Sequence, residues 1–294
     1  MENRKFISVV IPTYNRKSLL KSCLDSLTVQ TYPKSLFEVI IVDDGSTDGT
    51  EDLVHAYETE IKINFSYFKQ NNKGPAAARN LGIGKARGEL IAFTDDDCTV
   101  AENWLEECVK CFDSDYVGGV GGSINQKEGG IISEFMDFHE VMQAPVVNGE
   151  ILYLVTANAV YQRDILIAVS GFEEKIRNPG GEDPDLSMKV KEKGYVLKYN
   201  PDSVVYHYHK DNITSFYKTF YNYGRGARFL WEKWGDKLVN KSLLQSPFSE
   251  ILGWNNLKAI YGYYKFVGGK KSLPFWMLKS AQIYAISRGF QKGY

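Results

Sequence analysis

The sequence of 294 residues contains no long hydrophobic run, no internal repeat and no low-complexity linker. No stretch approaches the roughly 18 apolar residues that a membrane-spanning helix needs. At the start, MENRKFISVVIPTYNRK, polar residues directly follow a short apolar stretch, which is unlike a signal peptide. These absences argue against an integral membrane protein and a repeat protein. We therefore expect a globular protein that is made and kept in the cytoplasm.

Cysteine is scarce, with Cys23, Cys98, Cys108 and Cys111 as the four examples. Cys108 and Cys111 form a C-x-x-C pair, but no second pair of cysteines or histidines follows at zinc spacing. We expect reduced cysteines that lie partly in the core, because a disulfide framework is not usual in a cytoplasmic chain.

Charge is balanced overall but unevenly distributed. Of 35 Lys and Arg residues and 36 Asp and Glu residues, 13 and 4 respectively lie from residue 211 onward. The hydrophobic content of 44% and the aromatic content of 14% are typical of a packed globular protein. The chain is therefore an acidic body followed by a basic, aromatic tail.

Three nearly continuous apolar runs, at residues 6–12, 37–42 and 89–93, predict strands buried on both faces, as in a parallel sheet. Helical patterns over 18–27 and 75–86 lie between them. This alternation predicts a doubly wound α/β fold. We expect two parts of this fold, at 1–114 and 115–212, followed by a mostly helical extension at 213–294.

Each of these strands ends in polar residues: Pro12 to Asn15, Asp43 to Ser46, and Asp95 to Asp97. In open α/β sheets, ligands bind outside the carboxyl ends of the strands. The ends of the three strands therefore predict a binding site.

Adjacent carboxylates repel one another, so ionising all of Asp95, Asp96 and Asp97 is costly. A divalent cation with oxygen preference, Mg²⁺ or Mn²⁺, would remove that cost. The alternative is a solvated acidic turn or helix start, which Asp also favours.

At the second strand end, Asp43 and Asp44 could accept hydrogen bonds from a nucleobase or a ribose. The same stretch, DDGSTDGT, is also good turn chemistry, which leaves both interpretations open. Thr13 and Tyr14 at the first strand end add a hydroxyl and a ring that could stack.

A set of motifs occurs in order over about residues 6–210: SVVIPTYNR (8–16), QTYP (30–33), VIIVDDGSTDGT (39–50), GPAAARNLGI (74–83), GELIAFTDDDC (88–98) and GGEDPDLSMKVKEKG (180–194). Together they resemble the family 2 glycosyltransferases of GT-A fold, which have a Rossmann-like sheet with helices on both faces. The resemblance implies an inverting enzyme that moves a sugar, a hexose or an N-acetylhexosamine, from a nucleotide-sugar to an acceptor hydroxyl. It also implies that 1–114 is the nucleotide-sugar-binding half of the domain and 115–212 the acceptor-binding half.

The resemblance also implies roles for individual residues. Asp97 would bind Mn²⁺ or Mg²⁺, and His207 would be a further metal ligand, whose imidazole suits Mn²⁺ better. Residues implied in nucleotide-sugar binding are Pro12, Thr13, Tyr14, Arg16, Asp43, Asp44, Arg79, Asp95 and Asp96. His209 and His139 carry less support as ligands.

An inverting transfer needs a base that takes the proton of the acceptor hydroxyl. The stretch GGEDPDLSMKV offers Glu182, Asp183 and Asp185. Because Pro184 favours the first turn of a helix, Asp183 could simply be a helix N-cap. The resemblance implies that Asp183 is the general base, with Glu182 and Asn158 on the acceptor side.

The tail mixes Lys and Arg with Trp, Tyr and Phe, which suits an anionic membrane surface. It could also be a helical subdomain that packs on the body, or Arg225 and Arg228 could reach the diphosphate. No nucleic-acid motif accompanies it, so we expect no nucleic-acid partner. A peripheral site on the inner face of the plasma membrane would fit a lipid-linked acceptor. The tail lacks the QxxRW element of processive relatives, which favours single-sugar addition.

The sequence thus predicts transfer from a UDP-sugar, because Tyr14 and Asp44 suit a pyrimidine, in synthesis of a bacterial-type surface polysaccharide or lipid-linked glycan. Two alternatives remain at this point. A sugar nucleotidyltransferase has a similar sheet but usually opens with a Gly-rich phosphate loop, whereas PTYNRK contains no glycine. A non-catalytic nucleotide-binding scaffold would have no need of Asp97 and Asp183.

Overall fold

A computed structural model of the chain describes residues 5–60, 63–127, 129–208, 211–235, 263, 265 and 267–294. Strands and helices alternate over the first hundred residues, as the apolar runs predict. The strands are β1 (Ile7–Thr13), β2 (Phe37–Asp43), β3 (Asn64–Lys69), β4 (Leu90–Phe93), β5 (Cys98–Val100), β6 (Val117–Gln126), β7 (Val146–Val147), β8 (Glu150–Ile151), β9 (Ala159–Gln162) and β10 (Val196–His207). The helices are α1 (Lys17–Thr28), α2 (Thr50–Glu60), α3 (Pro75–Lys85), α4 (Trp104–Lys110), α5 (Ile131–Phe138), α6 (Arg163–Ala168), α7 (Glu182–Glu192), α8 (Ile213–Trp234) and α12 (Gly269–Lys292), with short 3-10 turns η1 (Lys34–Leu36) and η2 (Thr156–Asn158).

Eight strands form one mixed sheet in the order β3-β2-β1-β4-β9-β6-β10-β5. Strands β3, β2, β1 and β4 are mutually parallel, with β1 at the centre of this part. Strand β9 runs antiparallel to β4 and β6, and β5 runs antiparallel to β10. The three predicted strands and both predicted helices are confirmed, and the polar ends of β1, β2 and β4 lie at one edge of the parallel part.

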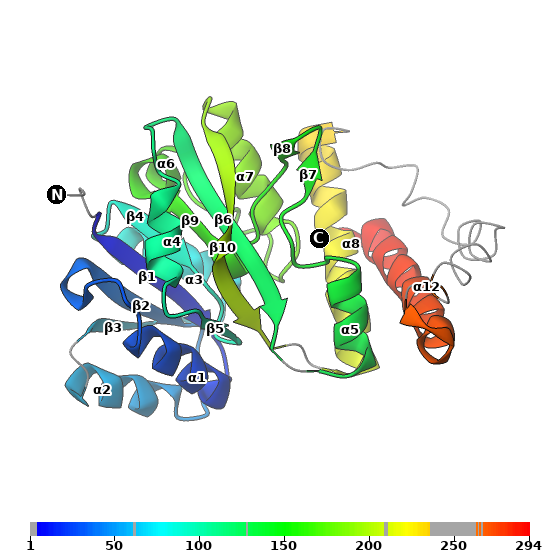
Figure 1. The fold of residues 1–294 in the computed structure, drawn as a ribbon, viewed down its shortest axis with the longest axis horizontal. Coiled ribbons are helices and arrows are strands. Elements are labelled where there is room, and N and C mark those ends of the chain that lie inside the picture. The colour runs from blue at the N-terminus through cyan, green and yellow to red at the C-terminus, as the bar shows by residue number, and fades with distance from the viewer. Residues whose placement is uncertain are drawn as a thin grey trace. The chain divides into compact units, whose positions relative to one another are not determined.

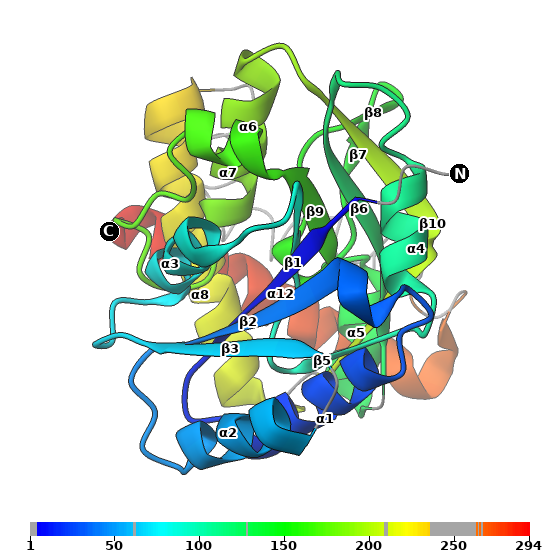
Figure 2. The ribbon, with the colours of Figure 1, turned by 90° about the vertical axis from the view of Figure 1, so that its left-hand side faces the viewer.

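Helices cover both faces of the sheet, so the prediction of an α/β fold of this kind is confirmed (Figures 1 and 2). Alternate residues of β1 divide between the faces: Val9 packs with α1, α2 and α4, whereas Val10 packs with α3, α6 and α7. Figure 2 shows α1 and α2 on one side of β1–β3 and α3 on the other. Because both faces are covered, β1, β2 and β4 are mostly apolar. The buried Ser8 of β1 and Glu38 of β2 are exceptions, and Ser8 Oγ donates to Glu38 Oε1 at 2.7 Å.

The described residues divide into two compact units. Residues within 1–127, 142–177 and 182–208 form the first, which holds the eight-stranded sheet. Residues within 128–141, 178–181 and 209–294 form the second, which holds α5, α8 and α12. The expected helical character of the C-terminal region is thereby confirmed, while the division at 114 and 212 stays a prediction.

In the second unit, helices α8 and α12 pack with their backbones nearly touching. A Cβ placed on Gly224 would lie 1.9 Å from the carbonyl oxygen of Ile286, so a glycine is required there. Phe135 of α5, Phe216 of α8 and Phe275 of α12 form the centre of this unit's own hydrophobic cluster. Within the part of the chain that is described, no helix has the length and apolar character that crossing a bilayer requires.

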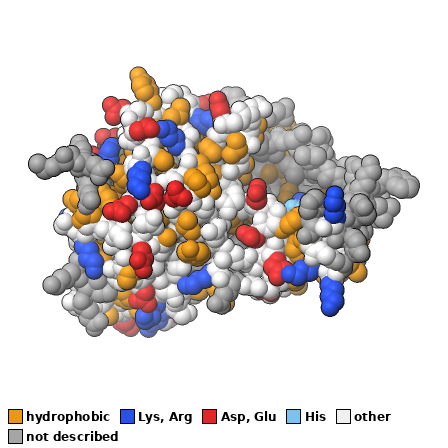
Figure 3. All heavy atoms as spheres, viewed as in Figure 1, with side chains coloured by type: hydrophobic (Ala, Val, Ile, Leu, Met, Phe, Trp, Pro, Cys, Tyr) orange, Lys and Arg blue, Asp and Glu red, His pale blue; other side chains and the backbone are white. Residues whose placement is uncertain are grey.

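The surface is mixed in character. On the face in Figure 3, acidic and basic side chains are interspersed with hydrophobic ones. All four cysteines are free; Cys23, Cys98 and Cys108 are buried and Cys111 is partly exposed, as expected for reduced core residues.

Two glycines of α3 provide a test of how this helix packs on the sheet. A Cβ at Gly82 would lie 2.3 Å from Cγ1 of Val10, whereas a Cβ at Gly84 would have no heavy atom within 4 Å. We expect Gly82→Ala to lower the free energy of unfolding by about 1–3 kcal/mol through overpacking. Gly84→Ala should raise it by about 0.5–1 kcal/mol, because alanine loses less backbone entropy in a helix. Urea denaturation followed by circular dichroism measures both, and equal effects would contradict the close packing of α3 on β1.

Candidate active site

The three consecutive carboxylates after β4 are neutralised by arginines that are distant in sequence. Arg16, which precedes α1, donates from Nη1 to Asp96 Oδ1 at 2.9 Å and to Asp97 Oδ2 at 2.6 Å. Thr13 Oγ1, at the end of β1, donates to Asp96 Oδ2 at 2.8 Å. The first strand end therefore contributes a hydroxyl and a cation to the acids of the third, because β1 and β4 are parallel neighbours.

Asp95 is neutralised from α3. Arg79 Nη2 donates to Asp95 Oδ1 at 2.7 Å, and its Nη1 lies 3.4 Å from Glu182 Oε1, at the start of α7. Arg79 is 4% exposed, so this guanidinium is a buried link between the acid cluster and the Glu182–Asp183 pair. Arg79 contacts Asp95, Glu182 and the ring of Phe172, and its predicted position at the nucleotide stays a prediction.

Burial changes the acidity of two of these carboxyls. Desolvation, with repulsion from Asp97 second, raises the pKa of Asp96 to about 7, even though Arg16 and Thr13 favour its charged form. Desolvation also raises the pKa of Asp183, against the opposing effects of Arg79 and Thr156. The site therefore contains carboxyl groups that can hold or release a proton nearer to neutral pH than an ordinary aspartate.

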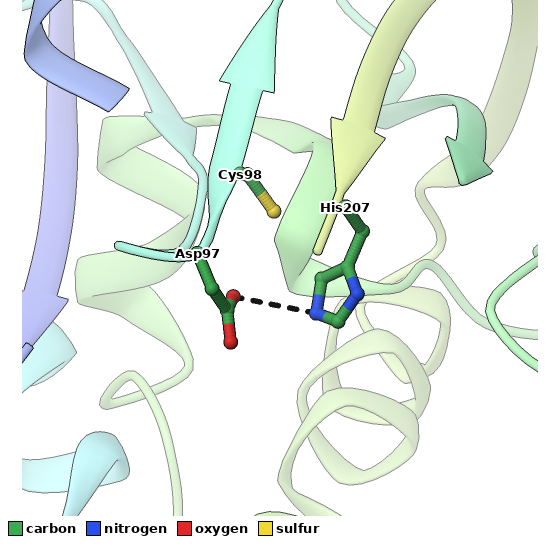
Figure 4. A group of neighbouring side chains, drawn as sticks. All are labelled: Asp97, Cys98 and His207. Atoms are coloured by element: carbon green, nitrogen blue, oxygen red, sulfur yellow. Dashed lines mark ion pairs between the residues drawn. The ribbon is translucent and has the colours of Figure 1, made fainter. Parts of the chain in front are cut away.

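Asp97 and His207 are well placed to hold a divalent cation together. His207 is the last residue of β10 and pairs in register with Cys98, so its ring reaches the acid cluster. Its Nε2 lies 3.3 Å from Asp97 Oδ1, and Figure 4 shows the two side chains facing each other. Two donor atoms that bind one octahedral ion at right angles, each about 2.1 Å from it, lie about 3 Å from each other. The separation of Asp97 Oδ1 and His207 Nε2 is close to this value. The residues present therefore fit the Mn²⁺ or Mg²⁺ that the sequence predicts.

Cys98 is a third member of this group, and sequence reasoning did not single it out. Its sulfur and the Asp97 and His207 donor atoms lie within 4.8 Å of one another. Burial raises the pKa of the Cys98 thiol well above its usual range, so it stays protonated and is a poor ligand for a hard cation. Its position directly after Asp97 is the one local signal that could have drawn attention to it.

The second strand end is organised as a turn held by carboxylates. Asp44 accepts from the backbone N–H groups of Lys73 and Gly74, at 2.7 and 2.9 Å, and from Gln70 Nε2 at 2.7 Å. Asp43 accepts from Tyr67 Oη at 2.6 Å and from Ser46 N at 2.7 Å. Both acids thus shape the rim of the site, and their predicted contacts to a nucleotide stay predictions.

Pro12 and Tyr14 lie on either side of the first strand end. Pro12 is buried within β1 opposite Val42, whereas Tyr14 is 47% exposed beyond it. An exposed ring at a strand end is available for stacking on a base, which is the role that the sequence predicts for Tyr14.

The interpretation of Asp183 as a helix N-cap is wrong. Helix α7 begins at Glu182, so Asp183 and Pro184 belong to its first turn, after Gly180 and Gly181 with positive φ angles. The carboxylate instead accepts from Thr156, through the backbone N–H to Oδ2 (3.1 Å) and through Oγ1 to Oδ1 (2.6 Å). Sequence reasoning missed Thr156 in this role, because the contact joins residues that are far apart in the chain.

Several other candidates have contacts of a structural kind. Asn158 is 1% exposed; it accepts from Trp104 Nε1 and donates to the carbonyls of Ser123 and Ser203, contacts that do not favour the acceptor-side prediction. His139 Nε2 lies 2.8 Å from Tyr263 Oη in the second unit. Arg225 Nε donates to the carbonyl of Gly293.

Arg228 pairs with Glu232, one turn later in α8. A contact of Arg225 or Arg228 with a diphosphate stays a prediction. His209 lies outside the described residues.

Comparison with known proteins defines the family. Residues 8–169 match the family model described as Glycosyl transferase family 2, and residues 90–287 match Glycosyl transferase family group 2. The chain is 32% identical over 204 residues to Glycosyltransferase AglE of Haloferax volcanii, which covers 69% of this chain and 66% of AglE. It is 28% identical over 159 residues to the poly(ribitol-phosphate) beta-N-acetylglucosaminyltransferase TarS of Staphylococcus aureus, which covers 54% of this chain and 28% of TarS. The chain therefore spans only part of these relatives.

Solved structures agree on the fold. The mannosyltransferase PcManGT from Pyrobaculum calidifontis, in complex with GDP-Man and Mn²⁺, superposes with a TM-score of 0.72 at 20% identity and covers 99% of this chain and 88% of its own. TarS residues 1–349 with UDP-GlcNAc superpose with a TM-score of 0.58 at 19% identity, covering 98% and 92%. The fold is that of a GT-A protein. The chain belongs to glycosyl transferase family 2.

Binding of Mn²⁺ to the free chain tests the assignment of Asp97. Removing a residue that hydrogen-bonds to a metal ligand typically lowers the metal affinity about 10–100-fold. Asp97→Asn changes the proposed ligand itself, so it should weaken binding by at least that much. Arg16→Gln should strengthen binding, because the guanidinium competes with the ion for the same carboxylate. Electron paramagnetic resonance of free Mn²⁺ measures both.

Lys17→Gln is the matched control, since it removes a positive charge from the next residue, whose side chain contacts neither acid in the structure. If Asp97→Asn bound Mn²⁺ as well as the unmodified chain, the ion would lie elsewhere. If Arg16→Gln behaved like Lys17→Gln, the competition would be disproved.

Proposed function

We propose that the protein is a metal-dependent inverting glycosyltransferase that uses Asp183 as its general base. The observation that carries this proposal is the buried link through Arg79. One guanidinium contacts both Asp95, in the acid cluster after β4, and Glu182, which precedes Asp183. Donor-side and base-side acids therefore belong to one site rather than to separate surfaces.

The proposed reaction is a single displacement at the anomeric carbon of the donor. The acceptor oxygen forms a bond to that carbon while the bond to the diphosphate oxygen breaks, and the nucleoside diphosphate leaves with the electron pair. The acceptor attacks from the face opposite the leaving group, as a single displacement requires, and the hydroxyl proton moves to Asp183. A cation held by Asp97 and His207 would stabilise the negative charge on the diphosphate.

The protonation state of Asp183 decides when this reaction can run. The group accepts a proton only when it is ionised, and its pKa is raised by desolvation in the folded chain. Activity should therefore decline on the acid side at a higher pH than for an ordinary aspartate. A half-buried carboxyl of this kind is a stronger base than a solvated one, which suits it to the task.

The donor is proposed to be a UDP-sugar, and the acceptor a surface polysaccharide or lipid-linked glycan. The exposed ring of Tyr14 beside the strand-end acids supports binding of a nucleotide base. Among the relatives, TarS is solved with UDP-GlcNAc and PcManGT with GDP-Man, so both nucleotides belong in any test. No specific observation favours the nucleotidyltransferase or the scaffold alternative.

Nucleotide release from a panel of UDP-, GDP- and dTDP-sugars with Mn²⁺ tests the proposal. We expect release from at least one donor, and Asp183→Asn should lower the rate by about 10²–10⁴-fold, the usual contribution of a general base. Asp164→Asn, whose side chain is 96% exposed in α6, is the control and should be unaffected. Release of pyrophosphate from a nucleoside triphosphate and a sugar phosphate would instead establish a nucleotidyltransferase.

We also propose that the second unit contacts an anionic membrane surface, which would bring the enzyme to a lipid-linked acceptor at the inner face of the plasma membrane. Leu273 and Met277 of α12 are 55% and 58% exposed, one turn apart, and the exposed Lys270 and Lys271 lie just before them. Apolar side chains beside lysines are typical of helices that lie in the interface.

Sedimentation with vesicles of phosphatidylglycerol tests this contact. Leu273→Ser with Met277→Ser should weaken binding by about tenfold or more, since burying one such side chain contributes about 1.5–3 kcal/mol. Tyr116→Ser, at a residue 73% exposed in the first unit, is the control. Equal binding by both variants, or binding that added salt does not weaken, would contradict the proposal.

A further inference from the structure

Both oxygens of the Asp183 carboxylate are held by one residue, Thr156. The Thr156 hydroxyl donates to Oδ1 at 2.6 Å, and the Thr156 backbone N–H donates to Oδ2 at 3.1 Å. Thr156 is 1% exposed, so water does not compete for these donors. A carboxylate offers about four lone-pair positions, so two remain for the hydroxyl of an acceptor.

Thr156 is itself fixed to the helix that carries Asp183. Leu154 N donates to Ser187 Oγ at 3.0 Å, and Ser187 lies one turn after Asp183 on the same face of α7. On the other side of Thr156, Asn158 is tied to Trp104 and Ser203. The segment 154–158 is therefore held at both ends, and the donors of Thr156 have a fixed direction.

We propose that Thr156 is the positioning residue of the general base: it sets the orientation of the Asp183 carboxylate and keeps it in the ionised form that accepts the proton. This inference rests on the proposed function of Asp183. A hydrogen bond to a charged carboxylate favours the charged form, and it counteracts the desolvation that burial imposes. Without it, Asp183 would be oriented only by its own side-chain torsions and would be protonated over a wider range of pH.

Other groups also act on Asp183, from each element packed around it. Arg79 of α3 favours its charge, whereas Asp95, after β4, opposes it. Glu182 is its neighbour in α7, and Tyr153 and Tyr161 are close enough to feel its charge. None of these is altered by a change at the Thr156 hydroxyl, so its effect can be measured separately.

Titration of the Asp183 carboxyl carbon by NMR, in protein with ¹³C-labelled aspartate, tests the inference directly. The signal is assigned by its loss in Asp183→Asn. Thr156→Val keeps the branched shape but removes the hydroxyl donor, and it should raise the titration midpoint by about one pH unit. That value follows from about 1.5 kcal/mol for a hydrogen bond to a charged group and 1.36 kcal/mol per pH unit. Thr156→Ser should restore the midpoint.

Ser187→Ala is the matched control, because it removes a hydrogen bond to the same segment without touching the carboxylate. Its midpoint should move much less than that of Thr156→Val, because the Thr156 hydroxyl that contacts the carboxylate is retained. The inference is overturned if Thr156→Val leaves the midpoint unchanged, or if Ser187→Ala raises it equally, since the effect would then come from loosening the segment.

Kinetics separate this inference from the proposed function. With UDP-GlcNAc or GDP-mannose as the probe donor, whichever releases nucleotide, Thr156→Val should lower kcat about tenfold at pH values below both titration midpoints, with little change in the KM for the donor. The acid limb of its pH–rate profile should shift to higher pH by the same amount as the NMR titration midpoint. Full activity of Asp183→Asn would refute the proposed base itself. Loss of activity in Asp183→Asn together with an unaltered pH profile in Thr156→Val would refute only the role of Thr156.

Discussion

The compensation of three consecutive carboxylates by two distant arginines is the interaction on which the site depends. Asp95, Asp96 and Asp97 follow a buried strand, where unbalanced negative charge would be strongly unfavourable. Arg79 neutralises Asp95, and Arg16 neutralises Asp96 and Asp97. Each arginine comes from a helix or helix start that packs beside the same strand end. The sheet therefore has to form before the acid cluster can exist in this form.

The two arginines differ in how far solvent reaches them. Arg79 is buried and linked to acids on both sides, so it is a permanent part of the scaffold that connects α3, the β4 end and α7. The Arg16 side chain is 37% exposed and contacts the carboxylate that also faces His207. The acid cluster is thus compensated by one buried guanidinium and one that solvent reaches.

Positive charge and hydrogen bonds also compensate the burial of Asp183. Desolvation makes a carboxyl such as Asp183 more basic but also tends to keep it protonated. Arg79 and Thr156 oppose that tendency from two directions, so the group is buried enough to be basic and still able to ionise. This balance is what the proposed role of Asp183 as a general base needs. It arises from contacts among α3, η2 and α7, which only the folded sheet brings together.

The sequence by itself determined the elements and the chemical types at their ends. Apolar runs predicted β1, β2 and β4, because strands covered on both faces are mostly apolar, and the motifs predicted the family and its acids. Only the tertiary structure decided which residues meet: Arg16 with Asp96 and Asp97, Arg79 with Asp95 and Glu182, and Thr156 with Asp183. It also showed that Asp183 lies inside α7 rather than capping it. The local sequence indicates secondary-structure propensity and hydrophobic periodicity. These pairings instead depend on strand order and helix packing, which bring together residues up to about a hundred positions apart.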